Sequence, residues 1–215
     1  MPSLLPAAAE ITALHDALLA TAGWPQQEPA PRDDGLWRWV QTNHLFNCRL
    51  WAEEDLARRT KVSDAEIAKN KRAIDGFNQA RNDATERVDE VLLVALGLVD
   101  PASARTDAPV STVPAGARLN SETAGSMIDR LSIMALKINA MRAQTERRDA
   151  DAEHIAASRV KLARLEQQRA DLAGCLDALL ADAQAGRAYF KVYRQFKMYN
   201  DPRFNPVLVA ESRQR

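Results

Sequence analysis

Apolar residues recur along most of this chain at the three- and four-residue spacing that defines one face of an α-helix. Ile11, Leu14 and Leu18 follow this spacing in a first segment, 6–21. The same period continues through the segments 35–61 and 63–99, and again from about residue 120 to residue 186. Glycine and proline fall mainly between these segments, and no strand of significant length is predicted. The pattern therefore predicts an all-α fold, a bundle of long helices.

Polar residues mark where two of these helices begin. Ser63-Asp64-Ala65-Glu66 forms a capping box, in which Ser63 and Glu66 each satisfy a free backbone amide of the other residue. Asp33 or Asp34 is predicted to cap the preceding helix. The helix that starts at Ser63 extends to about Val99.

Two segments rich in proline and small residues divide the chain. The segment 23–35 contains three prolines and cannot be helical, so 1–34 is predicted to be a short helix followed by a linker. Proline, alanine, serine and threonine dominate 100–118, which predicts a flexible linker. The linker separates a first helical half, 35–99, from a second half, 119–215, that packs on it.

The second half is predicted to form a coiled-coil-like helical hairpin. Its first helix is capped by Asn120 or Ser121, and a turn follows near 147–153. The next helix carries an apolar stripe of Ile155, Leu162, Leu165, Leu172, Leu176 and Leu179. Such a stripe pairs either within the chain or with a second copy, and its length favours a homodimer.

Basic and aromatic residues alternate near the C-terminus. On a helix, this segment would place Tyr189, Tyr193 and Phe196 on one face, and Lys191, Arg194 and Lys197 on another. This combination can bind nucleic acid. However, the 29 lysines and arginines equal the 29 aspartates and glutamates, so no net positive charge attracts a polyanion. We therefore expect the aromatic side chains to dock on the bundle and do not expect nucleic acid as a partner.

Few features of the sequence point to a specialised compartment. Cys48 and Cys175 lie far apart and belong to no metal-binding cluster, which is typical of a reducing compartment. The N-terminal segment lacks the basic start of a secretory signal. No apolar stretch approaches the roughly 20 residues that a membrane-spanning helix needs. The sequence therefore predicts a cytoplasmic protein without a membrane span.

Charged and polar residues occupy helix faces that a simple bundle would fill with leucine. In 35–61, one face carries Trp37, Val40, Cys48 and Trp51 together with His44, Asn47, Glu54, Asp55 and Arg58. Similar mixtures occur on the faces of 63–99 and of the helix after 120. Buried charge is costly unless it is paired, so these residues are expected to meet between helices. The predicted pocket consists of His44, Asn47, Trp51, Glu54, Asp55, Lys71, Asn78, Arg81, Asp89, Glu122, Asp129 and Arg130.

Three interpretations of these residues remain open. The first is an ion-pair network that fixes helix register, as in a purely structural dimerising bundle. The second is a pocket that binds an anionic small molecule. The third is a metal-dependent hydrolase or transferase acting on a nucleotide or sugar phosphate. In this third case Glu54, Asp55, Glu86 and Asp89 would hold Mg²⁺ or Mn²⁺, hard cations that prefer oxygen ligands.

Two details bear on the catalytic interpretation. Glu86-Arg87-Val88-Asp89 has the ExxD form of all-α, magnesium-dependent nucleotide pyrophosphohydrolases, but the chain lacks their second acidic motif at the required spacing. His44, between Asn43 and Asn47, could act as a base or as a metal ligand. A histidine beside tryptophans is more often a hydrogen-bonded core residue.

Several of these polar motifs resemble those of a bacterial domain-of-unknown-function family, number 4254, over about residues 35–206. They are Asn43-His44-Leu-Phe-Asn47, Leu50-Trp51-Ala-Glu-Glu54-Asp55, Lys71-Arg72-Ala-Ile-Asp75, Asn78-Gln-Ala-Arg81-Asn82-Asp83, Leu119-Asn120-Ser121-Glu122-Thr123, Ile128-Asp129-Arg130-Leu131-Ser132 and Lys197-Met-Tyr199-Asn200-Asp-Pro202. The family's genes are associated with glycosyltransferases of surface-polysaccharide assembly. The resemblance therefore implies an accessory role there, a glycosyltransferase partner, and a nucleotide-sugar or sugar phosphate as ligand. It implies no catalytic residues.

Overall fold

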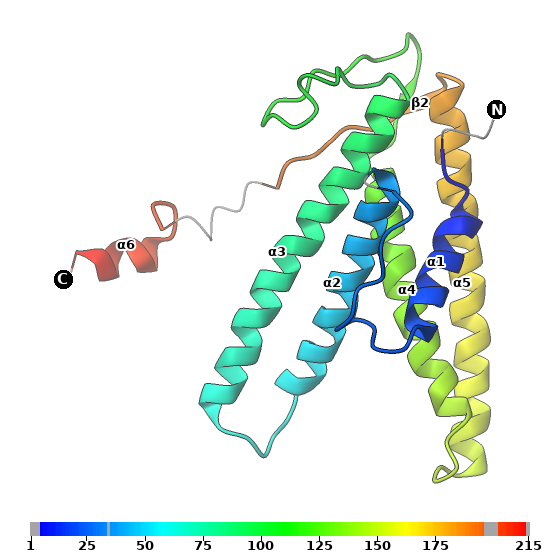
Figure 1. Ribbon diagram of the computed structural model, residues 1–215, viewed down its shortest axis with the longest axis vertical. Coiled ribbons are helices and arrows are strands. Elements are labelled where there is room, and N and C mark those ends of the chain that lie inside the picture. The colour runs from blue at the N-terminus through cyan, green and yellow to red at the C-terminus, as the bar shows by residue number, and fades with distance from the viewer. Residues whose placement is uncertain (1–4, 34, 196–201, 214–215) are drawn as a thin grey trace.

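The computed structural model describes residues 5–33, 35–195 and 202–213 and confirms the all-α fold (Figure 1). Its helices are α1 (Ala8–Ala20), α2 (Leu36–Ala57), α3 (Asp64–Ala95), α4 (Ala124–Thr145), α5 (Ala152–Gln184) and α6 (Pro206–Ser212). Two short strands, β1 (Arg118–Leu119) and β2 (Ala188–Tyr189), pair in parallel.

Two antiparallel helical hairpins, α2–α3 and α4–α5, form the body of the molecule (Figure 1). The helix α4 lies between them and contacts α2, α3 and α5, while α1 packs against α4 and α5. Buried apolar side chains from these helices, among them Leu92, Ile128, Leu131 and Leu176, form one core. Leu172, Leu176 and Leu179 of the predicted α5 stripe belong to this core, whereas Ile155, Leu162 and Leu165 are only partly buried.

The capping box of α3 is confirmed, whereas the N-caps of α2 and α4 are Gly35 and Thr123 and so differ from the predicted residues. Ser63 accepts a hydrogen bond from the Glu66 amide at 3.3 Å and the Glu66 side chain returns one, as the capping box requires. Asp33 accepts from the amides of Gly35 and Trp37, whereas Asp34 lies outside the described residues. The cap of α4 is Thr123, rather than Asn120 or Ser121.

The predicted helical segment after Gly186 is wrong for the residues up to 195, which the structure describes. This segment is extended: Ala188, Phe190 and Val192 are buried, and the residues between them are more exposed. The aromatic and basic residues alternate with a period of two as well as a helical period, and burial of the even-numbered side chains selects the extended form. Phe196, Lys197 and the rest of the predicted face lie outside the described residues.

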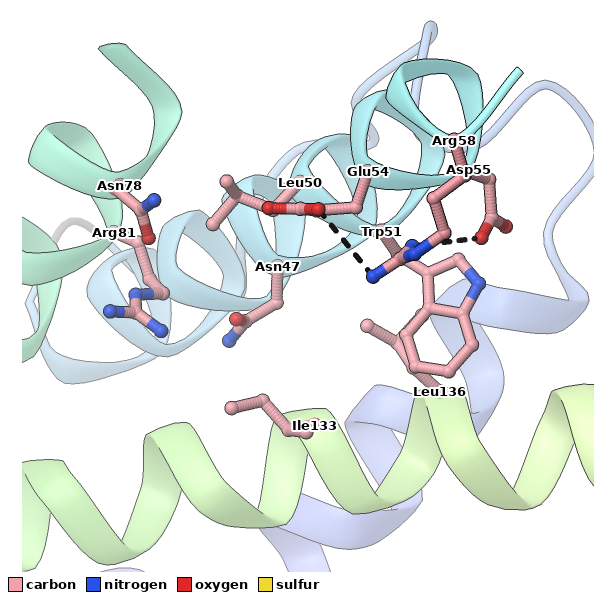
Figure 2. Close-up of a pocket in the computed structure, with 10 residues that line it drawn as sticks. All are labelled: Asn47, Leu50, Trp51, Glu54, Asp55, Arg58, Asn78, Arg81, Ile133 and Leu136. Carbon is pink, nitrogen blue, oxygen red and sulfur yellow. Dashed lines mark hydrogen bonds and ion pairs between the residues drawn. The ribbon is translucent and has the colours of Figure 1, made fainter. Parts of the chain in front are cut away.

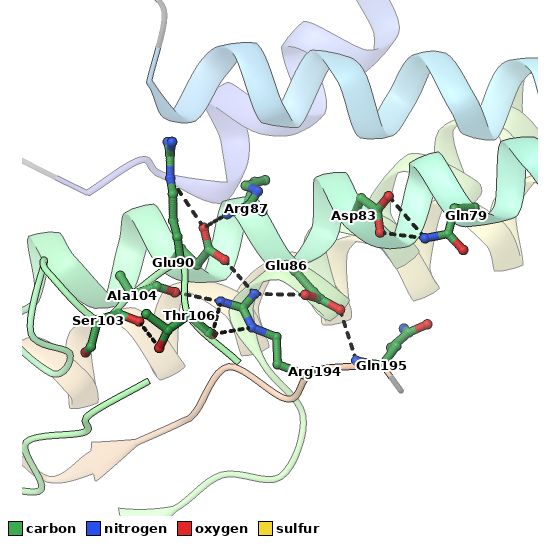
Figure 3. Close-up of polar contacts among 11 residues, drawn as sticks. Gln79, Asp83, Glu86, Arg87, Glu90, Ser103, Ala104, Thr106, Arg194 and Gln195 are labelled. Atoms are coloured by element: carbon green, nitrogen blue, oxygen red, sulfur yellow. Dashed lines mark hydrogen bonds and ion pairs between the residues drawn. The ribbon is translucent and has the colours of Figure 1, made fainter. Parts of the chain in front are cut away.

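The segment 100–118 is held to the bundle at several points. A bridge joins Val99 to Ser111, and the side chain of Ala104 is buried. Figure 3 shows the strongest link, in which the Arg194 guanidinium donates to the backbone oxygens of Ala104 and Thr106 and to the carboxylates of Glu86 and Glu90. Arg194 therefore links the extended segment after β2 to the loop 100–118 and to α3.

A close crossing of α3 and α4 sets the position of the site. Gly125, in the first turn of α4, faces Thr85 and Asp89 of α3, and its amide donates to the Asp89 carboxylate at 2.7 Å. A carboxylate at this position accepts a hydrogen bond from a free amide at the helix start, and its negative charge is stabilised by the positive end of the helix dipole. None of the helices in the described part of the chain has the length and apolarity needed to cross a membrane.

Candidate functional site

A cavity of about 290 Å³, which we call the first cavity, opens between α2, α3 and α4 (Figure 2). It is lined by Asn47, Leu50, Trp51, Glu54, Asp55, Arg58, Asn78, Arg81, Ile133 and Leu136. Six of the twelve predicted pocket residues line it: Asn47, Trp51, Glu54, Asp55, Asn78 and Arg81. These six residues come from α2 and α3, and the fold places them around one cavity although they are distant along the chain.

The wall from α2 follows directly from helix geometry. Asn47, Trp51, Glu54 and Arg58 are spaced by four, three and four residues, so they lie one above another on the same face. The Trp51 side chain is partly open to the cavity, with 37% of the residue exposed. This wall therefore offers an aromatic surface between an amide and charged groups.

The other two helices supply contrasting walls. Asn78 and Arg81 lie one turn apart on α3, and Ile133 and Leu136 lie one turn apart on α4. Figure 2 shows the two apolar side chains facing the polar groups of α2 and α3 across the cavity. An apolar floor with a few polar groups is the usual composition of a small-molecule site.

A buried polar cluster behind the cavity fixes the position of Arg81. The Asp129 carboxylate accepts from the side-chain amides of Asn43 at 2.8 Å and Asn47 at 2.9 Å, both on the same oxygen. Its other oxygen lies 3.7 Å from the Arg81 guanidinium. Because protein donors already occupy Asp129, this residue orients Arg81 and Asn47 and lines no part of the first cavity.

The protein provides hydrogen-bond acceptors for only some of the donors of the Arg81 guanidinium. Within the described part of the chain its guanidinium makes one hydrogen bond, from Nη2 to Asn82 at 3.0 Å, and its buried Nε has no partner. Arg194, by contrast, uses Nε, Nη1 and Nη2 in five hydrogen bonds. The buried Nε is closed to a ligand, but Nη1 makes no hydrogen bond with a described residue and 24% of the side chain is exposed, so Nη1 can donate to a ligand in the cavity.

The carboxylates at the cavity rim, Glu54 and Asp55, form only long, solvent-exposed ion pairs with described residues. Arg58 lies 3.5 Å from both Glu54 and Asp55 (Figure 2), and its side chain is 67% exposed. Exposed ion pairs of this kind contribute little to stability, because water competes with both partners. The two carboxylates therefore remain available as acceptors for a ligand's hydroxyl groups.

His44 lies in the core behind the cavity. It is fully buried, its Nδ1 lies 2.8 Å from the Ser132 hydroxyl, and its ring stacks on that of His15 at 4.5 Å between centroids. Burial lowers the pKa of His44 to about 3, so the imidazole is neutral. These contacts match the core-residue interpretation of His44 better than the catalytic one.

The other predicted pocket residues lie elsewhere. Lys71 is exposed on α3, and Asp89 is buried at the start of α4, where burial raises its pKa to about 7. Glu122 and Arg130 form an ion pair with each other and line a different cavity, between α4 and α5. They are separated from the first cavity because the side of α4 that carries them faces α5.

The four carboxylates of the metal hypothesis do not converge. Glu54 and Asp55 lie at the cavity rim, Glu86 binds Arg194 at 2.8 Å, and Asp89 binds the amide of Gly125. Among the residues that the structure describes, no three histidine, cysteine, aspartate or glutamate side chains lie where they could share a metal ion. The spacing of Glu86 and Asp89 serves two structural bonds instead.

Sequence reasoning missed the residues that support the site. Asn43 and Ser132 belong to the buried cluster, with Asn47 donating to the Ser132 hydroxyl at 3.0 Å. Their helical spacing was a usable signal, because Asn43 precedes Asn47 by four residues and Ser132 follows Asp129 by three. Ile133 and Leu136 gave no such signal, since they fit an ordinary apolar stripe.

Comparison with known proteins gives a family assignment. No curated protein and no solved structure was found to match the chain. The region that does match a family, residues 37–192, includes every residue of the first cavity and leaves α1 outside. On this match, the chain belongs to the family described as Protein of unknown function (DUF4254).

Proposed function

We propose that the chain is a binding protein for a phosphorylated sugar, held in the first cavity. The observation that carries this proposal is the partly exposed Arg81 guanidinium, whose Nη1 has no hydrogen-bond partner among the described residues, in a cavity that is also lined by Trp51. Arginine binds phosphate oxygens through two parallel hydrogen bonds, and such charge-assisted bonds are the strong ones.

The rest of the lining suits a hydroxyl-rich group. The Asn78 carboxamide makes no hydrogen bond with any described residue, so it can both donate and accept. Glu54 and Asp55 can accept from further hydroxyls, and the exposed face of Trp51 can cover the apolar face of a sugar ring. Arg58 pairs with Glu54 and Asp55, so Arg81 is the cation of the lining that would bind the one anionic group of an otherwise neutral ligand.

The cellular setting that we propose is an accessory role in bacterial surface-polysaccharide synthesis, beside a glycosyltransferase. Support for this setting comes from the family resemblance. A binding role also fits the fate of the carboxylates, since the described residues bring no three of them together for metal-assisted hydrolysis.

Isothermal titration calorimetry with a panel of hexose 1-phosphates tests the proposal. Arg81→Gln should weaken binding at least tenfold, about 1.4 kcal/mol, because a charge-assisted bond is lost. Arg72→Gln is the matched control, since Arg72 is an exposed arginine on the same helix and is absent from the cavity lining.

The unfolding midpoint of each variant should be measured alongside, so that loss of binding is separated from loss of fold. If no hexose phosphate binds, or if Arg81→Gln binds as tightly as the wild type, the proposal is wrong. The charged residues of α2 and α3 would then be a structural network.

A further inference from the structure

A second cavity, of about 690 Å³, lies on the other flank of α4, between α4 and α5. Ile133 lines both cavities. On the helix, Leu136 faces the first cavity, whereas Met127 and Met134 face the second. The two cavities are therefore neighbours, separated by a ridge at Ile133.

Two cations flank this ridge. Arg130 precedes Ile133 by three residues and Lys137 follows it by four, so all three share one side of α4. Lys137 follows Arg130 by seven positions, so the two residues lie about 10 Å apart along the helix axis. Both cations line the second cavity, at the boundary with the first.

The side chains of both cations are exposed to solvent, but only one of them forms an ion pair with a described residue. Lys137 is exposed, and among the described residues its ammonium group has no hydrogen-bond or ion-pair partner. Arg130 bonds to Glu122, but 56% of its side chain stays exposed. The other carboxylate of the cavity, Asp171, accepts from Gln167 at 2.8 Å. The two cations of this lining are matched by two carboxylates, so attraction for an anion is local, and it comes from Lys137, which has no carboxylate bonded to it among the described residues.

We infer that the two cavities hold one ligand, a diphosphate-linked glycoside. The sugar would occupy the first cavity, in the pose of the proposed function on which this inference rests. The phosphate linked to the sugar would stay on Arg81, the second phosphate would lie over Ile133 between Arg130 and Lys137, and the group beyond it would lie in the second cavity. The buried side chains of Met127 and Leu172 give that cavity an apolar floor, which suits a nucleobase or an isoprenoid chain.

The second cavity is larger than the first and has an apolar floor below its charged rim, as a large group beyond a diphosphate would require. A molecule that joins two subsites gains affinity over either half, because the second contact becomes intramolecular. Nucleoside and isoprenoid glycosides share the diphosphate, so the same rim would bind either of them.

Calorimetry with whole ligands and their halves tests the inference. The probes are hexose 1-phosphates, uridine and guanosine 5′-monophosphates, the matching UDP- and GDP-hexoses, and farnesyl-diphosphohexoses. At least one diphosphate-linked hexose should bind tenfold or more tightly than its hexose 1-phosphate. A preference for the nucleotide or the farnesyl series identifies the group in the second cavity.

Lys137→Gln is the discriminating variant, with Lys161→Gln, an exposed lysine on α5, as its matched control. Lys137→Gln should weaken the diphosphate-linked ligand about tenfold and leave hexose 1-phosphate within twofold, whereas Lys161→Gln should change neither. Met134→Trp, which fills the second cavity, should reduce the whole ligand to the affinity of the hexose 1-phosphate.

The outcomes separate the two proposals. If hexose 1-phosphate binds through Arg81 but no diphosphate-linked ligand binds more tightly, the inference is wrong and the proposed function stands. An equal loss of both ligands in Lys137→Gln also overturns the inference, because Lys137 would then act on the sugar phosphate. If no probe binds, both are wrong.

Discussion

A methyl group added at Gly125 should disturb the structure more than its size suggests. A Cβ atom there would lie 2.6 Å from the backbone oxygen of Thr85 and 2.9 Å from the carboxyl carbon of Asp89. Comfortable contacts between such atoms need about 3.5 Å or more. Because the nearest atom belongs to the backbone, α3 and α4 must separate in Gly125→Ala.

The expected loss of stability follows from three terms. Overpacking of this kind costs about 1–3 kcal/mol. Weakening the 2.7 Å bond from the Gly125 amide to the buried Asp89 carboxylate costs about 1–3 kcal/mol more. The helix preference of alanine over glycine returns up to about 1 kcal/mol. We therefore expect Gly125→Ala to lower the free energy of unfolding by about 3 kcal/mol.

Urea unfolding, followed by circular dichroism, measures this change against two controls. Gly174 in α5 and Gly76 in α3 have no atom within 4 Å of an added Cβ, so alanine at either position should stabilise the chain by about 0.5–1 kcal/mol. If Gly125→Ala unfolds at the same urea concentration as these controls, the close crossing of α3 and α4 is refuted.

Three further predictions concern buried and exposed groups. Burial lowers the pKa of His15 well below 6.5, so the unfolded chain binds more protons and stability falls as pH drops below about 6.5, at up to ~1.4 kcal/mol per unit. His15→Phe should make that fall less steep in urea titrations; an unchanged slope would contradict the burial. Arg194→Met should lower the free energy of unfolding by about 3 kcal/mol, because Glu86 and Glu90 lose the cation that they share and, among the described residues, keep only the Gln195 amide and Arg87, respectively, as hydrogen-bond donors. Arg105→Met removes a mostly exposed cation 3.9 Å from Glu90 and should change stability by less than about 0.5 kcal/mol. If Arg105→Met and Arg194→Met lose the same stability, the stabilising role assigned to Arg194 is refuted. In thiol labelling at pH 8, Cys175 is exposed and should react readily, whereas burial raises the pKa of Cys48 to about 11 and should protect it until the chain unfolds.

The helices were predictable because their signals are local. The capping box at Ser63 and the apolar period along each segment depend only on residues within one or two turns. The extended conformation of the segment after Gly186 was not predictable, because it depends on partners distant in sequence. Arg194, for example, binds α3 and the loop after α3 at the same time.

The site was predictable in part for the same reason. Polar residues on an apolar face of α2 and α3 identified Trp51 and Arg81, which do line one cavity. Periodicity alone could not tell that Asp89 would turn to the start of α4, or that Glu122 would face α5. The side of α4 that faces each neighbour depends on how the two hairpins dock, and the repeat of a single helix carries no such information.

The central claim is that a phosphorylated sugar binds between Trp51 and Arg81. Two-dimensional ¹H–¹⁵N NMR tests it directly, because the indole Nε1 of each of the four tryptophans and the Nε of each arginine give separate signals. On addition of a hexose 1-phosphate that binds in calorimetry, the largest shifts should occur at the Trp51 indole and at Arg81. Shifts confined to Trp37 and Trp39, outside the first cavity, or no shift at Arg81, would contradict the claim.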